Sequence, residues 1–301
     1  MLLPRRETVR TRVHRFRLEE EAEEPVIQVV DDVLATEEPM EIRVTVPPGD
    51  QTHSAAHTHS VAVTMRTPGH DFELAAGFLF TEGLVTRRRS ISRITYCSGD
   101  EPQEYNLVEV RLRGGAGFDP TALQRNFYMT SSCGICGKAS LEAVENLGCV
   151  VFPEATPGNP GLQVDARVLQ GIPHGLRAAQ PVFGRTGGLH AAGLFNSAGE
   201  LQSVREDVGR HNAVDKVVGH AFLEGRTPLS NSVLAVSGRT SFEILQKAVM
   251  AGIPIVVAVG APSSLAVDFA RRFRMTLTGF TRDGGFNVYA GRERILPAAA
   301  E

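Results

Sequence analysis

The strongest constraint on the fold of this chain is the alternation of apolar runs and helical segments in its second half. Residues 233–236 and 253–259 are continuous apolar runs of strand length, and segments with helical spacing follow them at 241–250 and 264–273. A helix between two strands carries the chain back to the other end of the sheet, so that the two strands run parallel. This alternation therefore predicts a largely parallel sheet covered by helices. Further elements predicted in the second half are strands at 189–195, 201–204 and 275–280, the first of which could instead be partly helical, and a helix at 210–223.

The first half shows a smaller pattern of the same kind. Three β-rich runs precede one helical segment, and they lie at 26–30, 40–46, 61–67 and 72–80, respectively. The first 24 residues are charge-rich, basic up to Arg17 and acidic after it, which is typical of a solvated or loosely held arm. We therefore expect an α/β protein with four parts: a charged arm at 1–24, a small α/β domain at 25–128, a mobile loop at 129–140 and a second domain at 141–301.

Composition excludes several classes of protein. The 42% hydrophobic and 22% charged residues are ordinary for a folded globule, and a net charge of −3 gives no overall attraction for nucleic acid or an anionic membrane. No stretch approaches the ~20 apolar residues of a membrane span, and the N-terminus runs into charge at Arg5, unlike a signal peptide. Four cysteines are too few for a disulfide-stapled secreted protein. We therefore expect a cytoplasmic protein without nucleic-acid or membrane partners.

Two of these cysteines lie three positions apart in the sequence SSCGICGK at residues 131–138. A short helix is predicted after them, so the helix N-terminus and Lys138 would both stabilise a thiolate, the nucleophilic form of cysteine. Reactive sulfur, half of a zinc site, a structural disulfide and two inert cysteines in a turn are the alternatives at this point. Cys97 and Cys149 stand alone and supply no second CxxC motif for a four-thiolate zinc site. We expect both to be buried small hydrophobes.

Polar side chains follow two of the predicted strands, where each strand opens into a helix. Arg239, Thr240 and Ser241 follow one strand, and Ser263 and Ser264 follow the next. The carboxyl ends of parallel strands meet at one edge of a sheet, where the N–H groups of helix starts bind anions. Serine and threonine at a helix start are often simple caps, but Arg239 adds a fork of donors. The two helix starts together predict an anion-binding crevice.

The segment at 205–216 is denser still, with two arginines, a histidine, an asparagine and three acids at a strand-to-helix junction. Charge clusters are usually solvated faces, but here His211 and Asn212 open directly onto a predicted helix and are candidate ligand contacts. Another polar segment holds three histidines, for which a metal site and a surface loop are the alternatives: His53, His57 and His59. We expect the loop, and no metal site, because no helical pattern aligns the imidazoles.

Five motifs that follow one another along the chain resemble the FdhD family, the sulfur carriers needed for formate dehydrogenase activity. They are CGICGK at 133–138, TGGLHAA at 186–192, DVGRHNAVDK at 207–216, SGRTSFE at 237–243 and APSSLA at 261–266. The segment ELAAGFLFTEG at 73–83 fits the N-terminal half of the same family. The resemblance implies a small N-terminal α/β domain followed by a cytidine-deaminase-like three-layer α/β domain.

Hydrolytic deamination is nevertheless disfavoured. Zinc deaminases use an H-x-E motif and a later P-C-x-x-C, in which the glutamate moves protons and the cysteines hold zinc. Here alanine stands at position 192, where the glutamate would be, and the CxxC motif precedes His190 without a proline before it.

The resemblance implies a sulfurtransferase that receives sulfane sulfur from a cysteine desulfurase and passes it to the bis-molybdopterin guanine dinucleotide cofactor, with molybdenum or tungsten, of formate dehydrogenase. By similarity Cys133 carries the persulfide and Cys136 assists or resolves it. A homodimer is also implied. The segment that resembles the family's cofactor-binding stretch joins the crevice residues in the expected site: Phe280, Thr281, Arg282, Asp283, Gly284 and Gly285, with Arg239, Thr240, Ser241, Ser263, Ser264, His211 and Asn212.

Two other functions stay open. CxxC chemistry also permits a thiol-disulfide oxidoreductase, although that motif normally opens a helix in an early βαβ unit. A non-catalytic chaperone of the molybdenum cofactor would bind the same ligand without using its thiols. Cys133→Ala would keep its function if the protein is a chaperone and lose it if the protein is a carrier.

Overall fold

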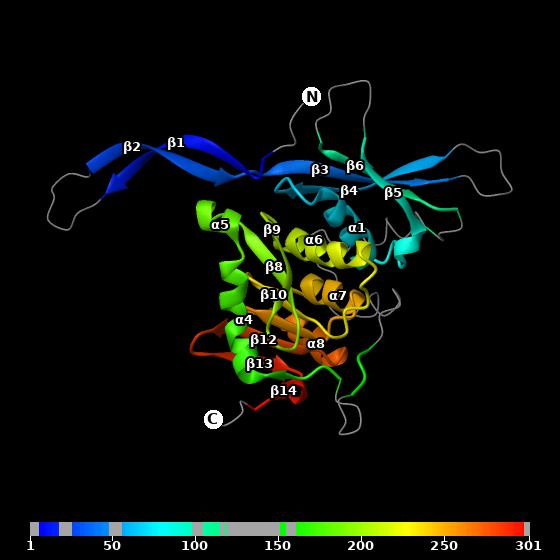
Figure 1. Ribbon diagram of the computed structural model, residues 1–301, viewed down its shortest axis with the longest axis vertical. Helices are drawn as coiled ribbons and strands as arrows, with labels where there is room; N and C mark the ends of the chain where they lie inside the picture. Colours follow the sequence, from blue (N-terminus) through cyan, green and yellow to red (C-terminus); the bar gives the residue numbers. More distant parts are fainter. Residues whose placement is uncertain are drawn as a thin grey trace.

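A six-stranded sheet with helices on both faces forms the larger part of this α/β protein (Figure 1). The computed structural model describes residues 6–17, 26–47, 56–97, 105–114, 118, 151–154 and 161–297. The strands of this sheet lie in the order β13-β12-β11-β10-β8-β9. Their bounds are β8 His190–Phe195, β9 Leu201–Asp207, β10 Val233–Val236, β11 Ile255–Ala258, β12 Thr276–Arg282 and β13 Gly285–Ala290.

The sheet is mixed, whereas the sequence pattern predicted a largely parallel one. Strands β10, β11 and β12 are parallel because α7 (Phe242–Met250) and α8 (Ser264–Arg272) carry the chain back between them. Strands β8 and β9 form an antiparallel hairpin, as do β12 and β13, and β8 also runs antiparallel to β10. Two strands that are joined by a short turn must run antiparallel. The helix-strand alternation therefore predicted the correct strand directions only for β10, β11 and β12.

Side chains of the central strands alternate between two helical layers. Val233 and Ala235 of β10 belong to the apolar cluster of α4 (Ala166–Ala178), whereas Leu234 and Val236 belong to the cluster of the opposite layer. That layer consists of α6 (Arg210–Leu223), α7 and α8 (Figure 1). The expected three-layer arrangement is therefore confirmed, and the likeness to cytidine deaminase stays a prediction. A short helix, α5 (Pro181–Thr186), follows α4.

A four-stranded sheet with the order β4-β3-β6-β5 makes up most of the first half. The segment with His57 and His59 lies in strand β4, where a surface loop was expected; His53 lies outside the described residues. The elements of the first half are β3 (Glu38–Val46), β4 (His57–Arg66), α1 (Asp71–Thr81), η1 (Arg88–Ser90), β5 (Ile91–Tyr96) and β6 (Leu107–Leu112). In the second half, β7 (Val164–Asp165) pairs with β14 (Ile295–Leu296), which follows η2 (Arg292–Arg294).

Residues 8–17 of the charged N-terminal segment form a strand, where the sequence analysis expected a solvated or loosely held arm. Strand β1 (Thr8–Arg17) pairs antiparallel with β2 (Val26–Ala35) over ten residues, and the pair projects from the body of the molecule (Figure 1). The charge pattern predicted solvent exposure, and most side chains of β1 are exposed. It did not show that the same residues pair with a β-rich run further along the chain. We call this pair of strands the β1–β2 ribbon.

Helices α1 and α6 cross with their backbones in contact. A Cβ atom placed on Gly77 of α1 would lie 1.8 Å from the carbonyl oxygen of Asp215, and one placed on Gly219 of α6 would lie 1.9 Å from that of Glu73. No side chain fits at either position, so glycine is required at both for this approach. The crossing places the first half of the chain directly against the second.

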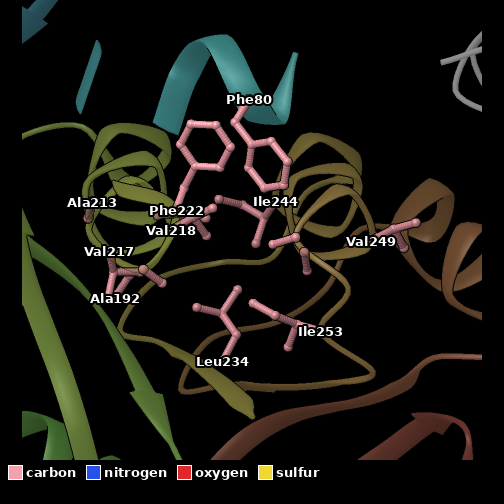
Figure 2. Close-up of a cluster of buried hydrophobic side chains, with 14 of the residues drawn as sticks. Phe80, Ala192, Ala213, Val217, Val218, Phe222, Leu234, Ile244, Val249 and Ile253 are labelled. Carbon is pink, nitrogen blue, oxygen red and sulfur yellow. The ribbon is translucent and has the colours of Figure 1, made fainter. Parts of the chain in front are cut away.

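One hydrophobic core extends across this crossing. The ring of Phe80 on α1 stacks on that of Phe222 on α6 with their centroids 4.5 Å apart, and Ile244 of α7 and Leu234 of β10 continue the same cluster (Figure 2). Inner residues of the four-stranded sheet, such as Ile42, belong to this cluster too. The two sheets are therefore supported by shared apolar packing rather than by separate cores.

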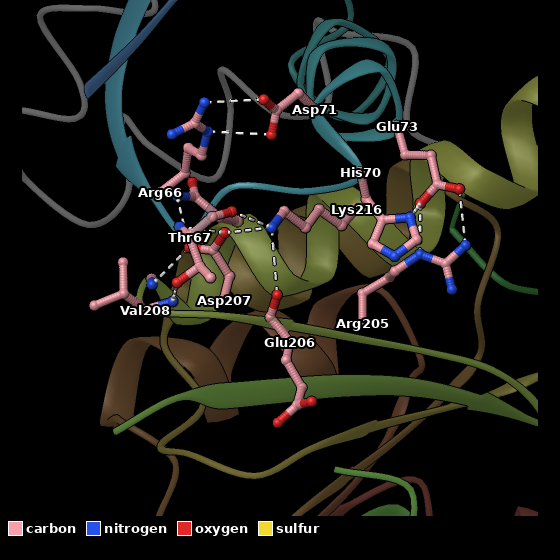
Figure 3. A network of polar contacts seen from close by, with 12 residues as sticks. Arg66, Thr67, His70, Asp71, Glu73, Arg205, Glu206, Asp207, Val208 and Lys216 are labelled. Carbon is pink, nitrogen blue, oxygen red and sulfur yellow. Dashed lines mark hydrogen bonds and ion pairs between the residues drawn. The ribbon is translucent and has the colours of Figure 1, made fainter. Parts of the chain in front are cut away.

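Buried and partly buried polar contacts also stabilise the junction between the two halves of the chain (Figure 3). The Nζ atom of Lys216 on α6 lies 2.7 Å from Oδ2 of Asp207 and donates to the carbonyl of Thr67, 2.8 Å away. The guanidinium of Arg205 pairs with Glu73 at the start of α1. The contacts of Lys216 with Thr67 and of Arg205 with Glu73 each join residues more than 130 positions apart, so the junction is specified by both halves of the chain.

Within the described residues, no helix is long and apolar enough to cross a membrane. The predicted domain boundaries at residues 24, 128 and 140 lie outside the described residues and stay predictions.

Candidate functional site at the carboxyl ends of the central strands

The loops after β10 and β11 meet the last residues of β12 at one edge of the sheet. The backbone N–H of Thr240 donates to the carbonyl of Ala261 (3.1 Å), and that of Ser263 donates to the carbonyl of Thr240 (3.0 Å). Strand β12 joins them through the N–H of Phe280, which donates to the carbonyl of Gly260 (3.2 Å). A Cβ on Gly260 would lie 2.9 Å from the carbonyl oxygen of Gly238, so this close approach requires glycine. The two helix starts thus lie side by side, as the sequence predicted.

The serines of these helix starts have different partners. The hydroxyl of Ser263 caps α8 by accepting from the N–H of Ala266 (3.2 Å). Ser241 is the N-cap of α7 but makes no side-chain cap; its hydroxyl lies 3.2 Å from Nε2 of His211 instead. Arg239 and Ser264 are exposed to solvent.

The contacts of His211 resemble a catalytic triad but do not form one. Burial, together with Arg210 and Lys247, lowers the pKa of His211 to about 4, so its imidazole is neutral at pH 7. Ser241 Oγ and Glu243 Oε2 approach the same ring nitrogen, Nε2, at 3.2 and 4.0 Å. A triad needs the acid on the other nitrogen, so this arrangement does not activate the serine hydroxyl.

Asn212 is used within the protein. Its Nδ2 donates to the carbonyl of Met65 (2.7 Å) and to Oδ1 of Asp207 (3.1 Å), and Oδ1 accepts from the hydroxyl of Thr64 (3.1 Å). The buried amide therefore holds β4 against the start of α6. Its part as a ligand contact stays a prediction.

A cavity of about 610 Å³ opens at the same edge of the sheet, on the side of α4. Its lining residues come from α4 and α5, from the turn after α5 and from the strand ends: Pro173, His174, Leu176, Arg177, Gln180, Phe183, Gly187, Gly188, Leu189, His190, Ser237, Val259, Thr281, Arg282 and Asp283. Its position matches the place where α/β sheets bind ligands.

The predicted segment at 280–285 contributes to this cavity. Thr281, Arg282 and Asp283 line it, and the buried Thr281 hydroxyl lies 3.1 Å from that of Thr278. Phe280 is 46% exposed and holds a left-handed backbone, with φ of 52°. The exposed Gly284 forms the turn between β12 and β13, and Gly285 has φ of 133°, which only glycine adopts readily.

The remaining predicted contacts lie on the adjoining loops and helix starts rather than among the residues that line the cavity: Arg239, Thr240, Ser241, Ser263, Ser264, His211 and Asn212. Two buried polar atoms of this region, Oγ1 of Thr240 and Nε of Arg210, have no hydrogen-bond partner in the described part of the chain. Buried polar groups ordinarily find a partner, so this edge of the sheet has unused capacity for one.

Several cavity residues were not among the predicted contacts. His190 begins β8, and burial together with Arg210 lowers the pKa of its imidazole. It belongs to the TGGLHAA motif, so the motif could have identified it. Arg177 and His174 come from α4, for which the sequence analysis predicted no element. Their place in the site follows from the packing of α4 across the sheet.

The lining suits an anionic ligand. Arg177 and Arg282 carry positive charge, Asp283 is the acid among the described lining residues, and the glycines at 187 and 188 leave the backbone accessible. The Arg177 guanidinium lies 4.1 Å from the ring centroid of Phe183, and this cation–π contact positions the arginine at the wall of the cavity.

The predicted reactive cysteines, Cys133 and Cys136, lie outside the described residues, as does Cys149. Cys97 is half-buried, and its Sγ donates to Oε2 of Glu109 at 3.5 Å. Burial and this carboxylate raise the pKa of the Cys97 thiol. Cys97 therefore stays protonated, although it is less buried than the sequence predicted.

Comparison with known proteins gives consistent matches over most of the chain. A sulfur carrier protein FdhD of Streptomyces avermitilis is 51% identical over 272 residues, covering 89% of this chain and 91% of the relative. One from Mycolicibacterium paratuberculosis is 52% identical over 267 residues, covering 88% and 92%. The crystal structure of a candidate formate dehydrogenase accessory protein from Desulfotalea psychrophila matches with a TM-score of 0.69 and 25% identity, covering 95% of this chain and 99% of that one.

A sequence profile of the FdhD/NarQ family matches residues 36–296. This range begins between β2 and β3 and ends in β14, so it includes both sheets, the α1–α6 crossing and the cavity. The chain is therefore a member of the FdhD/NarQ family.

Proposed function

We propose that this protein is a sulfur carrier that accepts persulfide sulfur from a cysteine desulfurase and passes it to the bis-molybdopterin guanine dinucleotide cofactor of a formate dehydrogenase. The observation that carries the proposal is the basic cavity at the ends of β10, β11 and β12, in a chain about half identical to proteins named sulfur carrier protein FdhD. Three residues of the segment expected to bind this cofactor, Thr281, Arg282 and Asp283, line that cavity.

The lining supports this class of substrate. The cofactor presents pyrophosphates and guanine rings, and the cavity offers two arginines, accessible glycine backbone and an arginine stacked on Phe183. We propose that Arg282 and Arg177 bind the phosphates. The Asp283 carboxylate would accept hydrogen bonds from the N–H groups of guanine. The molybdenum or tungsten atom belongs to the substrate, and no resident metal is part of the proposal.

The sulfur chemistry is assigned to Cys133. Its thiolate attacks the terminal sulfur of the desulfurase persulfide, takes that sulfur as its own persulfide and releases the desulfurase thiolate, so this step involves no net oxidation. Cys136 then attacks Sγ of Cys133 and breaks the bond to the terminal sulfur. This sulfur takes the proton of the Cys136 thiol, leaves as hydrosulfide toward the metal, and a Cys133–Cys136 disulfide remains. The two thiols supply the two electrons that reduce sulfane sulfur to sulfide.

Mass spectrometry of the full chain after incubation with a cysteine desulfurase and cysteine tests the first step. We expect a reducible adduct of about 32 Da on the peptide that contains Cys133, absent in Cys133→Ala. Cys136→Ala should load sulfur but fail to release it. Cys97→Ala is the matched control, because the Cys97 thiol is held protonated by Glu109 and should not take part.

Each alternative function gives a different result. If the desulfurase itself is charged but no persulfide forms on Cys133, the carrier assignment is wrong and a cofactor chaperone becomes the better description. If Cys133→Ala supports formate dehydrogenase maturation, the same conclusion follows. A thiol-disulfide oxidoreductase would reduce protein disulfides at a rate that depends on both cysteines and needs no desulfurase.

We also propose that the protein acts in the cytoplasm as a homodimer, as the family resemblance implies. Its partners would then be a cysteine desulfurase and a formate dehydrogenase. Neither partner requires this chain to have a surface that binds a membrane or nucleic acid.

A further inference from the structure

The carboxylate of Glu206 caps a helix that lies outside its own strand. Glu206 belongs to β9, and its Oε1 and Oε2 atoms accept hydrogen bonds from the backbone N–H groups of Phe183 (2.7 Å) and Val182 (3.0 Å) at the start of α5. Figure 3 shows this side chain directed away from Lys216, which contacts the backbone carbonyl of Glu206 instead. The carboxylate of Glu206 therefore acts outside the junction between the two halves of the chain.

Helix α5 depends on this cap because little else holds its first turn. Of its six residues only Val182 is buried, and so short a helix is unstable without outside contacts. Its N-cap, Gln180, makes no side-chain cap, and Pro181 has no N–H to donate. The N–H of Gly184 donates to the carbonyl of Gln180 (2.9 Å). Glu206 thus satisfies both remaining N–H groups of the first turn and places negative charge at the positive end of the helix.

Phe183, which Glu206 holds, contacts an arginine of the cavity. The guanidinium of Arg177 lies 4.1 Å from the centroid of the Phe183 ring, and both residues line the cavity. Because Arg177 is exposed, its long side chain would sample many rotamers without this contact. An arginine that is already held in place loses less entropy when it binds an anion. The position of α5 therefore affects how well Arg177 binds a ligand.

We propose that Glu206 is a positioning residue of the cavity, whose carboxylate fixes the start of α5 so that Phe183 holds Arg177 in the conformation that binds phosphate. The proposal rests on the proposed function, in which Arg177 binds the phosphates of the cofactor. Glu206 is not among the residues that line the cavity, so it acts through Phe183 and Arg177 rather than by touching the ligand.

The direction of the effect separates this role from a simple effect of charge. Glu206 lies opposite Ala191 in the sheet, next to the cavity residue His190. A carboxylate there repels an anionic ligand, so neutralising a Glu206 that acted through its charge alone would strengthen binding. If Glu206 positions Arg177, Glu206→Gln should weaken binding instead. The glutamine amide would present an NH₂ donor to one of the two N–H groups of α5, where the carboxylate presents an acceptor.

Calorimetric titration of the full chain with GDP, which carries a pyrophosphate and a guanine, measures the effect on binding. We expect Glu206→Gln to bind GDP about threefold more weakly than the wild type. In an Arg177→Ala background the same change should cause no further loss, because the residue through which Glu206 acts is absent. In an Arg282→Ala background the threefold loss should persist. Glu200→Gln, which removes a charge from the turn between β8 and β9, is the matched control and should bind GDP like the wild type.

An NMR measurement without ligand tests the positioning itself. The Arg177 guanidinium lies over the Phe183 ring, so the ring current should shift its Nε–H signal upfield, and Phe183→Leu should abolish that shift. In Glu206→Gln and Glu206→Ala the signal should move toward its position in Phe183→Leu, whereas in Glu200→Gln it should stay. A general loss of stability would not move this signal in a folded protein. Circular dichroism and thermal melting establish that all variants are folded at the temperature of measurement.

The two measurements distinguish failure of this inference from failure of the proposed function. An Arg177 signal that is unchanged in both Glu206 variants shows that Glu206 does not position Arg177. Tighter binding of GDP by Glu206→Gln, or an equal loss in the wild-type and Arg177→Ala backgrounds, overturns the inference as well. If Arg177→Ala binds GDP like the wild type, the phosphate assignment in the proposed function is wrong, and the inference fails with it even where the NMR signal responds to Glu206.

Discussion

At the scale of single residues, Glu73 shows how one carboxylate joins distant parts of the chain. Its oxygens lie near His70 (3.2 Å) and His220 (3.1 Å) and pair with the guanidinium of Arg205. Burial alone would raise the pKa of Glu73, but the hydrogen bonds from Arg205 and His70 outweigh it and lower that pKa to about 2. The ionised form of Glu73 therefore contributes to folding.

Glu73→Gln should make stability less dependent on acid. The folded pKa of about 2 lies below the ordinary value of 4.5, so the stabilisation by Glu73 is fully present above pH 4.5 and is lost as the pH falls toward 2. We expect the free energy of unfolding of the variant, measured by urea denaturation, to be on the order of 3 kcal/mol below that of the wild type at pH 7. This gap in unfolding free energy should close as the pH falls from 4.5 toward 2. Glu200→Gln, at an exposed hairpin turn, is the control. A gap that is constant from pH 7 to 3 would show that Glu73 acts through packing alone.

Arg282→Ala and Arg177→Ala should weaken binding of a guanine nucleotide to the cavity. Each removes one of the two arginines from the lining, and we expect a loss of about tenfold or more in calorimetric affinity for GDP, a probe of the pyrophosphate and the base. Arg93→Ala, an exposed arginine of the four-stranded sheet, should leave the affinity unchanged. Equal affinities in all four proteins would place the nucleotide elsewhere.

How far the sequence predicts single contacts depends on how local they are. Ser263 caps α8, as its position before a helix indicates, because a cap involves residues three apart. Ser241 holds an equivalent position, but its hydroxyl faces His211, thirty residues earlier. The sequence gives no measure of the distance between those two, so the partner of Ser241 could not be predicted.

At the scale of elements, the crossing of α1 and α6 has no room for a side chain at its two glycines. Gly77→Ala or Gly219→Ala would force the helices apart, because each added Cβ would overlap a backbone carbonyl that cannot rotate away. We expect each variant to be less stable by about 3 kcal/mol or more in denaturant unfolding. Gly171→Ala in α4 is the matched control, since nothing lies within 4 Å of its added Cβ. It should be neutral or slightly stabilising, as alanine favours helix.

Elements with a strong local pattern were predicted well. The helix at 210–223 and the strand at 233–236 have the bounds that the sequence indicated. The mixed direction of the sheet was missed, because strand direction depends on which strands become neighbours. The β1–β2 ribbon was missed for a related reason: arginine-rich β1 has no apolar alternation of its own and becomes a strand by pairing with β2.

At the scale of the whole molecule, both sheets contribute to one apolar core, and we expect them to unfold as one cooperative unit. Native-state hydrogen exchange should give the slowest amides of β3 and β11 the same opening free energy, although they lie in different sheets. Gly77→Ala should lower both by the same amount, because α1 packs against both parts. A decrease confined to β3 would mean that the four-stranded sheet unfolds by itself.

The location of the candidate site was predictable at this scale, whereas its full lining was not. Ligand sites lie beyond the carboxyl ends of parallel strands, and Thr281, Arg282 and Asp283 are there. Arg177 and His174 reach the site from α4, more than 100 residues earlier in the chain. Their contribution depends on which face of the sheet α4 covers, which no pattern within α4 specifies.

The backbone contact between Gly77 and Gly219 also limits how this protein can be rearranged by recombination. A chimera that takes its first half from one relative and its second half from another would inherit one glycine from each parent. Such hybrids should fold only when both parents keep glycine at the matching positions, however similar their cores are otherwise. Screening parents for that pair of residues is therefore a practical first filter when hybrid carriers are built.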